Sequence, residues 1–135
     1  MKIKLLDGQL PTRKHIDDAG LDCYSAEAVR LSPGATWRVR LGFAVQLLPG
    51  MELQIRGRSS VSAQGILCHL GTVDAGYRGE VSAVLTNLST ATYHINRGDR
   101  IAQAVVAMYH PLPFEVVDAL DDSDRGTGGF GSTGV

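Results

Sequence analysis

Apolar and polar residues alternate along many short segments of this chain, a pattern that indicates half-buried β-strands. The alternation is clearest at residues 37–41, where one face is apolar and the other cationic, and it returns at 51–56. Residues 101–108 form a near-continuous apolar run, as expected of a fully buried strand. The other expected strands are 2–6, 24–28, 29–31, 43–47, 66–70, 81–86, 93–95 and 114–117.

Glycine and proline turn signals separate these segments at close spacing, as at 32–34, 49–50 and 96–99. Many short strands joined by turns predict an all-β fold, a sandwich or a barrel. One short helix is expected at 60–64, with Ser59 or Ser60 as its N-cap.

The length of 135 residues suggests one domain, large enough to bury a core without disulfides. From Asp118 onward the sequence becomes acidic and then glycine-rich. We therefore expect a β domain over 1–117 and a flexible C-terminal arm over 118–135.

Charge and hydropathy exclude several classes of function. The formal net charge of −1 gives no basis for recruiting nucleic acid or an anionic membrane. No apolar run is long enough to span a bilayer, and no apolar segment follows the first residues as in a signal peptide. The two cysteines, Cys23 and Cys68, are too few for a disulfide framework. A cytoplasmic protein without nucleic-acid or membrane partners is expected.

Residues 71–80 concentrate chemically useful groups: a carboxylate, an aromatic ring, a guanidinium and three glycines. Strand signals on both sides predict a β-hairpin with Asp74 and Tyr77 at its bend. A carboxylate beside an aromatic plane suits a small planar ligand and a water to be activated. An ordinary turn explains these residues equally well, since Asp-x-Gly is common turn chemistry.

Two further segments suggest an anionic ligand. Residues 56–60 end a strand and open the helix, where free N–H groups, serine hydroxyls and Arg58 could bind phosphate. A plain N-cap beside a surface arginine is the alternative. Residues 125–134 contain a G-x-G-x-x-G match but no following helix, which excludes a dinucleotide-binding site. This tail could close over a phosphorylated ligand with Phe130 on a ring and Arg125 on phosphate, or be disordered.

Carboxylates and one amide complete the candidate residues. Asp17, Asp18 and Asp22 lie in one loop, where their oxygens suit a hydrated Mg²⁺ or serve only solubility. Gln103 interrupts an apolar strand, so it needs either a structural partner or a ligand.

Five segments occur in an order and spacing that closely resemble the five motifs of the trimeric dUTP diphosphatases (dUTPases): 19–26, 57–60, 71–80, 97–103 and 125–134. The third and fourth are the most specific. The resemblance implies a jelly-roll-like β-barrel or sandwich that forms a homotrimer with shared active sites and arms supplied by neighbouring subunits. It also implies hydrolysis of dUTP to dUMP and pyrophosphate, which limits uracil in DNA and supplies dUMP for thymidylate synthesis.

The resemblance assigns roles to individual residues. Asp74 would be the catalytic base that orients and deprotonates the water attacking the α-phosphorus. Tyr77 would lie under the deoxyribose and leave no room for a 2′-hydroxyl, and backbone near Gly71 and Ser82 would read uracil. Asp22 would hold a water of the Mg²⁺ shell. The other implied substrate-binding residues are Arg58, Ser59, Ser60 and Gln103 on phosphates, with Arg125, Phe130, Gly131, Ser132 and Thr133 from the arm.

The chain also departs from the family pattern. Many members have an asparagine where Cys68 stands, so base selection would rely on backbone or on His69. Residues 57–60 read Gly-Arg-Ser-Ser, and a similar Ser-Ser occurs in the homologous dCTP deaminases. A deaminase or bifunctional enzyme is therefore the main alternative, although Val84 replaces the glutamate that deaminases use. A non-catalytic nucleotide sensor on the same fold is the second alternative.

Overall fold

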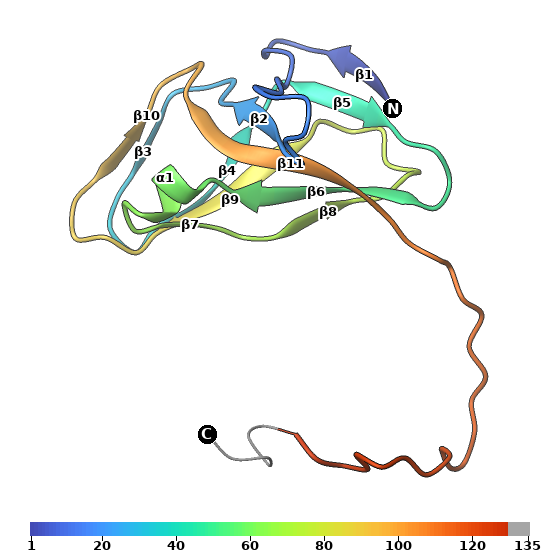
Figure 1. The fold of residues 1–135 in the computed structure, drawn as a ribbon. Coiled ribbons are helices and arrows are strands. Elements are labelled where there is room, and N and C mark those ends of the chain that lie inside the picture. Colours follow the sequence, from blue (N-terminus) through green and yellow to red (C-terminus); the bar gives the residue numbers. More distant parts are fainter. Residues whose placement is uncertain (130–135) are drawn as a thin grey trace.

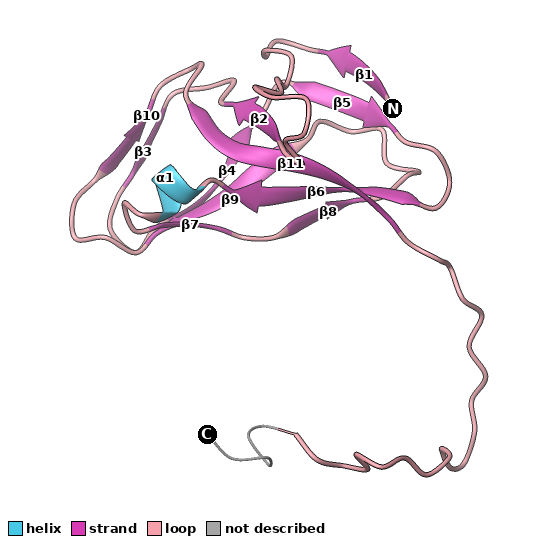
Figure 2. Cartoon of the chain, viewed as in Figure 1, coloured by secondary structure: helices cyan, strands magenta, loops and turns pink. Residues whose placement is uncertain are grey.

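The computed structural model describes residues 1–129, which form a β-strand body followed by an extended C-terminal segment (Figures 1 and 2). The strands are β1 (Lys2–Leu5), β2 (Leu21–Tyr24), β3 (Val29–Leu31), β4 (Thr36–Arg40), β5 (Phe43–Gln46), β6 (Met51–Gly57), β7 (Ile66–Cys68), β8 (Gly71–Val73), β9 (Ser82–Asn87), β10 (Tyr93–Ile95) and β11 (Arg100–Met108). Within the described chain, the only helix is α1 (Ser59–Ser62), which is far too short to cross a membrane.

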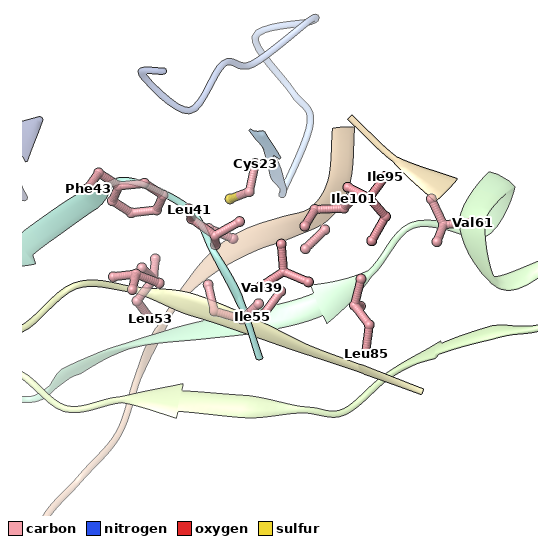
Figure 3. Packing of buried hydrophobic residues seen from close by; sticks show 14 of the residues in the cluster. Cys23, Val39, Leu41, Phe43, Leu53, Ile55, Val61, Leu85, Ile95 and Ile101 are labelled. Atoms are coloured by element: carbon pink, nitrogen blue, oxygen red, sulfur yellow. The ribbon is translucent and has the colours of Figure 1, made fainter. Parts of the chain in front are cut away.

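All strand pairs are antiparallel. A four-stranded sheet has the order β2-β11-β6-β8, a three-stranded sheet has the order β4-β9-β7, and β1-β5 and β10-β3 form two short ribbons. Leu53 and Ile55 of the larger sheet pack with Val39 and Leu85 of the smaller one in a single hydrophobic core (Figure 3). The prediction of an all-β fold is confirmed, and the sheets form a sandwich-like arrangement that does not close into a barrel.

Strand β11 is a central strand of the larger sheet. It pairs with β2 on one side and with β6 on the other, in register from Ala102↔Gly57 to Met108↔Met51. The apolar run at 101–108 is thus a central strand, but it is not fully buried as predicted. Ile101, Ala102 and Ala104 are buried, whereas Val106 and Met108 are 39% and 77% exposed, because pairing at both edges leaves the faces of a strand uncovered.

The helix differs from its predicted position. Arg58 is the N-cap residue and no side chain caps α1, so the predicted serine N-cap is wrong. The backbone of Arg58 is extended, and its carbonyl accepts hydrogen bonds from Val61 and Ser62 at 3.0 and 2.9 Å. Burial of Val61 fixes this single turn against the core.

Two predicted strands are also corrected. Residues 25–28 turn away from β2 because the Ser25 hydroxyl hydrogen-bonds to the carbonyl and the N–H of Glu27. No strand forms at 114–117, where Phe114 and Val116 are 93% and 91% exposed and find no sheet edge among residues 1–129. The chain instead leaves the body after β11 (Figure 1). The domain boundary at 117/118 stays a prediction.

Candidate functional site

The predicted hairpin forms, but its two arms separate before the bend. Strand β7 pairs with β9 as far as Cys68↔Leu85, and the last bond runs from the His69 N–H to the Val84 carbonyl at 2.9 Å. The chain then leaves the hairpin, since β8 pairs with β6 in the other sheet. This change of partner removes β8 from the edge of β9 and opens a gap between the two strands.

A pocket of about 220 Å³, here called the hairpin pocket, lies where the arms separate. It brings together three predicted site residues, Asp74, Tyr77 and Ser82, whereas Gly71 opens β8 without lining it. The full lining is Arg38, Thr72, Val73, Asp74, Tyr77, Glu80, Val81, Ser82 and Val84. Sequence reasoning missed Arg38, which comes from the distant strand β4.

Local hydrogen bonds shape the turn that carries Tyr77. The Tyr77 N–H donates to the Asp74 carbonyl at 3.0 Å, and its hydroxyl donates to the Glu80 carbonyl at 3.2 Å. Gly79 permits this fold, because a Cβ at that position would lie 2.3 Å from the tyrosine oxygen. Arg78 donates to the Ala75 and Tyr77 carbonyls, each at 2.7 Å. The tyrosine ring is therefore held in place by its own turn.

The two carboxylates of the hairpin pocket differ in their partners. Glu80 accepts hydrogen bonds from Arg40 Nε and the Gly42 N–H, each at 3.0 Å. The hydrogen bond to Glu80, and then that to Asp7, raise the pKa of Arg40. Asp74 is exposed and makes no side-chain hydrogen bond or ion pair with any residue of 1–129. Glu80 thus anchors the turn, while the Asp74 carboxylate is free to bind a water or a ligand.

A second pocket of about 530 Å³, here called the cationic pocket, brings together three of the candidate site residues, Asp22, Arg58 and Gln103. Asp22 accepts from Arg58 Nε at 2.7 Å and from Arg100 Nη1 at 3.2 Å. The sequence reasoning assigned no role to Arg100, although it lies inside the fourth motif-like segment. The other residues that line the cationic pocket are Thr12, Lys14, His15, Asp18, Ala19 and Gly20.

Gln103 has both a structural partner and a position at this pocket. Its Nε2 donates to the Gly57 carbonyl at 2.7 Å across the β11–β6 ladder. Gly20 allows the loop to approach, since a Cβ there would lie 2.2 Å from the glutamine oxygen. Ser59 and Ser60 are exposed at the start of α1, and Ser60 lines an adjoining polar depression that also includes Arg58.

The two pockets share no lining residue. Val73 lies opposite Leu53 on β6, whereas Arg58 follows the far end of the same strand. Five residues of extended strand correspond to roughly 15 Å. One chain therefore does not bring Asp74 next to its own Arg58.

The carboxylates near the cationic pocket do not form a metal-binding cage. Among residues 1–129, no three His, Cys, Asp or Glu side chains gather in a way that could hold a metal ion. Asp18 accepts from the His15 N–H at 2.8 Å, and both oxygens of Asp22 face arginines. Asp22 fits the role of accepting a hydrogen bond from a metal-bound water better than that of a direct ligand.

Cys68 and His69 stand where the hairpin opens. Burial raises the pKa of Cys68 to about 11, so it is a neutral thiol at physiological pH. The His69 ring hydrogen-bonds to the Thr86 hydroxyl at 2.8 Å and does not line the hairpin pocket.

The described arm residues, 118–129, line neither pocket. Arg125 Nε donates to the Gly128 carbonyl at 2.9 Å in the extended segment that runs away from the body (Figure 1). The predicted contacts of Phe130, Gly131, Ser132 and Thr133 fall outside the described residues.

Comparison with known proteins identifies the family. The dUTPase family model matches residues 7–134. Deoxyuridine 5′-triphosphate nucleotidohydrolase of Zymomonas mobilis is 43% identical over 146 aligned positions that cover both chains completely. A mutant dUTPase of Staphylococcus bacteriophage 80alpha with dUpNHpp superposes with a TM-score of 0.95 at 28% identity, covering 99% of this chain and 98% of that one. A mutant dUTPase of Staphylococcus aureus phage phi11, described with a structural Mg(II) ion, superposes at 0.85 with 27% identity over 90% and 98% of the chains. The chain therefore belongs to the dUTPase family of enzymes.

Proposed function

We propose that this protein hydrolyses dUTP to dUMP and pyrophosphate, with Asp74 as the base that activates the attacking water. The observation that carries the proposal is the hairpin pocket, where the edges of β8 and β9 face one cavity beside Asp74 and Tyr77. Such an activity limits uracil in DNA and supplies dUMP for thymidylate synthesis.

The separated strands support recognition of the base through backbone groups. The β7–β9 ladder stops at Leu85, so the backbone of β9 toward Ser82 is not paired with β7. Fixed backbone donors and acceptors can distinguish uracil from cytosine without ordering a long side chain. This arrangement compensates for Cys68 in place of the family asparagine.

Tyr77 supports selection of the sugar. Its ring is pinned between Gly79 and the Glu80 carbonyl and forms one wall of the hairpin pocket. A rigid ring beneath the deoxyribose excludes the extra 2′-hydroxyl of a ribonucleotide by steric contact.

Asp74 supports the chemical step. A general base must reach the proton it removes, and its unpaired carboxylate can accept a hydrogen bond from water. As the water oxygen bonds to the α-phosphorus, Asp74 takes its proton. The bond between the α-phosphorus and the bridging oxygen breaks, and pyrophosphate leaves with the electron pair.

The cationic pocket supports binding of the triphosphate. Arg58 and Gln103 line it, and Ser59 and Ser60 follow at the start of α1. Bound Mg²⁺ would neutralise phosphate charge, and Asp22 would hold one of its waters. The arm would add Arg125, Phe130, Gly131, Ser132 and Thr133.

The separation of the two pockets supports a homotrimer with shared sites. Val73, the neighbour of Asp74, pairs with Leu53, which is five strand residues or roughly 15 Å from Arg58 in the same chain. This distance supports a neighbouring copy as the source of the cationic pocket that faces this hairpin pocket. The described part of the arm, residues 118–129, likewise lines neither pocket and leaves the strand body after β11 (Figure 1), which supports its contributing to a site on another copy. We place this enzyme in the cytoplasm, where it would act on the nucleotide pool.

A release assay across nucleotides tests the proposed function. Pyrophosphate should form from dUTP with Mg²⁺ much faster than from dCTP, dTTP or UTP, and no ammonia should appear. Val84, which has no carboxylate, lines the hairpin pocket where a deaminase needs one. Equal turnover of dCTP, or ammonia release, would overturn the proposal in favour of a deaminase or bifunctional enzyme. Binding of dUTP without turnover would favour a sensor.

A further inference from the structure

Arg38 is a pocket residue that the proposed function leaves unused. It lies on β4 opposite Val84 of β9, and both line the hairpin pocket. The next residue, Val39, is completely buried in the core. Because side chains alternate along a strand, Arg38 is fixed on the outer face of this sheet. A ladder of paired residues, rather than a loop, holds its backbone in place.

Arg38 and Arg40 share this face but differ in their partners. Arg40 forms ion pairs with Glu80 at 3.0 Å and with Asp7 at 2.8 Å. Arg38 makes no side-chain hydrogen bond or ion pair with any other residue in the described part of the chain. Asp74 has none either, so two unpaired opposite charges line one pocket without pairing with each other. Such convergent polar groups are typical of a site that binds a ligand between them.

The order of residues along the pocket shows which part of a nucleotide would meet Arg38. Asp74 and Tyr77 lie in the turn before β9, and Ser82 is the first residue of β9. Val84 is two residues beyond Ser82 on β9, and Arg38 pairs with Val84 from the neighbouring strand β4. Two strand residues span roughly 7 Å. In the proposed function the α-phosphate lies at Asp74 and the sugar at Tyr77. Arg38 is therefore at the opposite end, where the tip of the base would lie.

We propose that Arg38 adds to the base specificity of the backbone groups by donating a hydrogen bond to O4 of uracil, an inference that rests on the proposed function. O4 is the carbonyl oxygen farthest from the glycosidic bond, and it is an acceptor. Cytosine carries an amino group at the same position, which is a donor. A guanidinium has donors only, so it pairs with the carbonyl and opposes the amine. Arg38 would thus supply a side-chain donor that Cys68 does not.

Three variants test this proposal: Arg38→Met, Arg38→Lys and the control Arg30→Met. Arg30 is an exposed arginine of β3 that does not line the hairpin pocket, so its loss makes the same change in net charge elsewhere. In Arg38→Met, kcat/KM for dUTP should fall about tenfold, as for loss of one charged hydrogen bond, while that for dCTP stays unchanged or rises. Arg38→Lys should retain part of the preference for dUTP, and Arg30→Met should retain all of it.

Two results would overturn the proposal. If Arg38→Met lowers kcat/KM equally for dUTP and dCTP, Arg38 acts on a phosphate and not on the base. If neither value changes, Arg38 does not contact the nucleotide. Calorimetric binding of dUMP and dCMP provides a separate readout, because Arg38→Met should lose affinity for dUMP only. If the wild-type protein releases no pyrophosphate, the proposed function fails, and a loss of dUMP preference in Arg38→Met would still support the role of Arg38.

Discussion

The hairpin pocket and the cationic pocket differ in how their charges are used. In the cationic pocket, Asp22 is held between Arg58 and Arg100, and Gln103 is bonded to Gly57. In the hairpin pocket, the Asp74 carboxylate has no partner among residues 1–129. Paired charges give a preorganised surface suited to binding phosphates, since little needs to reorganise. An unpaired carboxylate on a braced turn suits proton transfer, because nothing competes with the water.

Removing the free carboxylate should have the largest effect. Asp74→Asn deletes the proposed base with almost no change of shape, so kcat should fall by about 10²- to 10⁴-fold. Binding of a non-hydrolysable dUTP analogue and the melting temperature should change little, because the side chain is exposed. Pyrophosphate release and calorimetry measure these quantities, with Glu115→Gln, an exposed carboxylate that lines neither pocket, as the control. Near-normal turnover in Asp74→Asn would remove the chemical role of the hairpin pocket.

Breaking the paired cluster should have the next largest effect. Arg58→Met removes a phosphate donor and leaves Asp22 with Arg100 alone, so kcat/KM for dUTP should fall on the order of a hundredfold. Steady-state kinetics measure the loss. Stability should change by about 1 kcal/mol at most, because the pair is partly solvated.

Mixing the two inactive variants tests whether the pockets come from different subunits. When Asp74→Asn and Arg58→Met chains are refolded together, about a quarter of the sites should combine one intact pocket from each and regain activity. The same mixture without refolding is the control. No recovery after refolding would show that a single chain supplies both pockets.

Removing residues 125–135 should affect catalysis more than folding. None of residues 125–129 belongs to the hydrophobic core, and the proposal places Arg125 on phosphate. Loss of one charge-assisted contact should lower kcat/KM by at least about tenfold with an unchanged melting temperature. Kinetics and thermal unfolding on the same preparation measure both effects. Full activity after truncation would mean that the two pockets suffice without the arm.

The smallest expected effect is alkaline destabilisation through the thiols beside the two pockets. Burial raises the pKa of Cys23 to about 12 and that of Cys68 to about 11, from an ordinary 9.0. The folded state holds these protons more tightly, so this stabilisation is complete below pH 9 and is lost as pH rises through 11 to 12. The slope is at most about 1.4 kcal/mol per pH unit per thiol, and less for the partly exposed Cys68.

Urea unfolding at pH 8 and pH 10 measures this loss. Cys23→Ala should remove more of the pH dependence than Cys68→Ala, because Cys23 is fully buried in the core. An equal pH dependence in both variants and the wild type would assign the alkaline loss to other groups.

Much of the site was readable from the sequence because its chemistry is local. The segment 71–80 contains its carboxylate, aromatic ring and glycines within ten positions, and the turn made by Tyr77 and Gly79 depends on neighbours in the same segment. The apolar run at 101–108 likewise indicates a strand by composition alone, although only its N-terminal part is buried. Local pattern therefore determined the all-β class, and the resemblance of five local segments to the dUTPase motifs assigned the candidate residues.

The tertiary structure decided what depends on distant partners. A strand needs a neighbouring edge, so the alternation at 114–117 was insufficient, whereas β8 formed by pairing with β6. That pairing opens the hairpin pocket, and the β4–β9 register places Arg38 in it. The sequence alone determined which chemical groups this protein carries. Only long-range hydrogen bonding decided which of them meet, because backbone pairing between remote segments has no local signature.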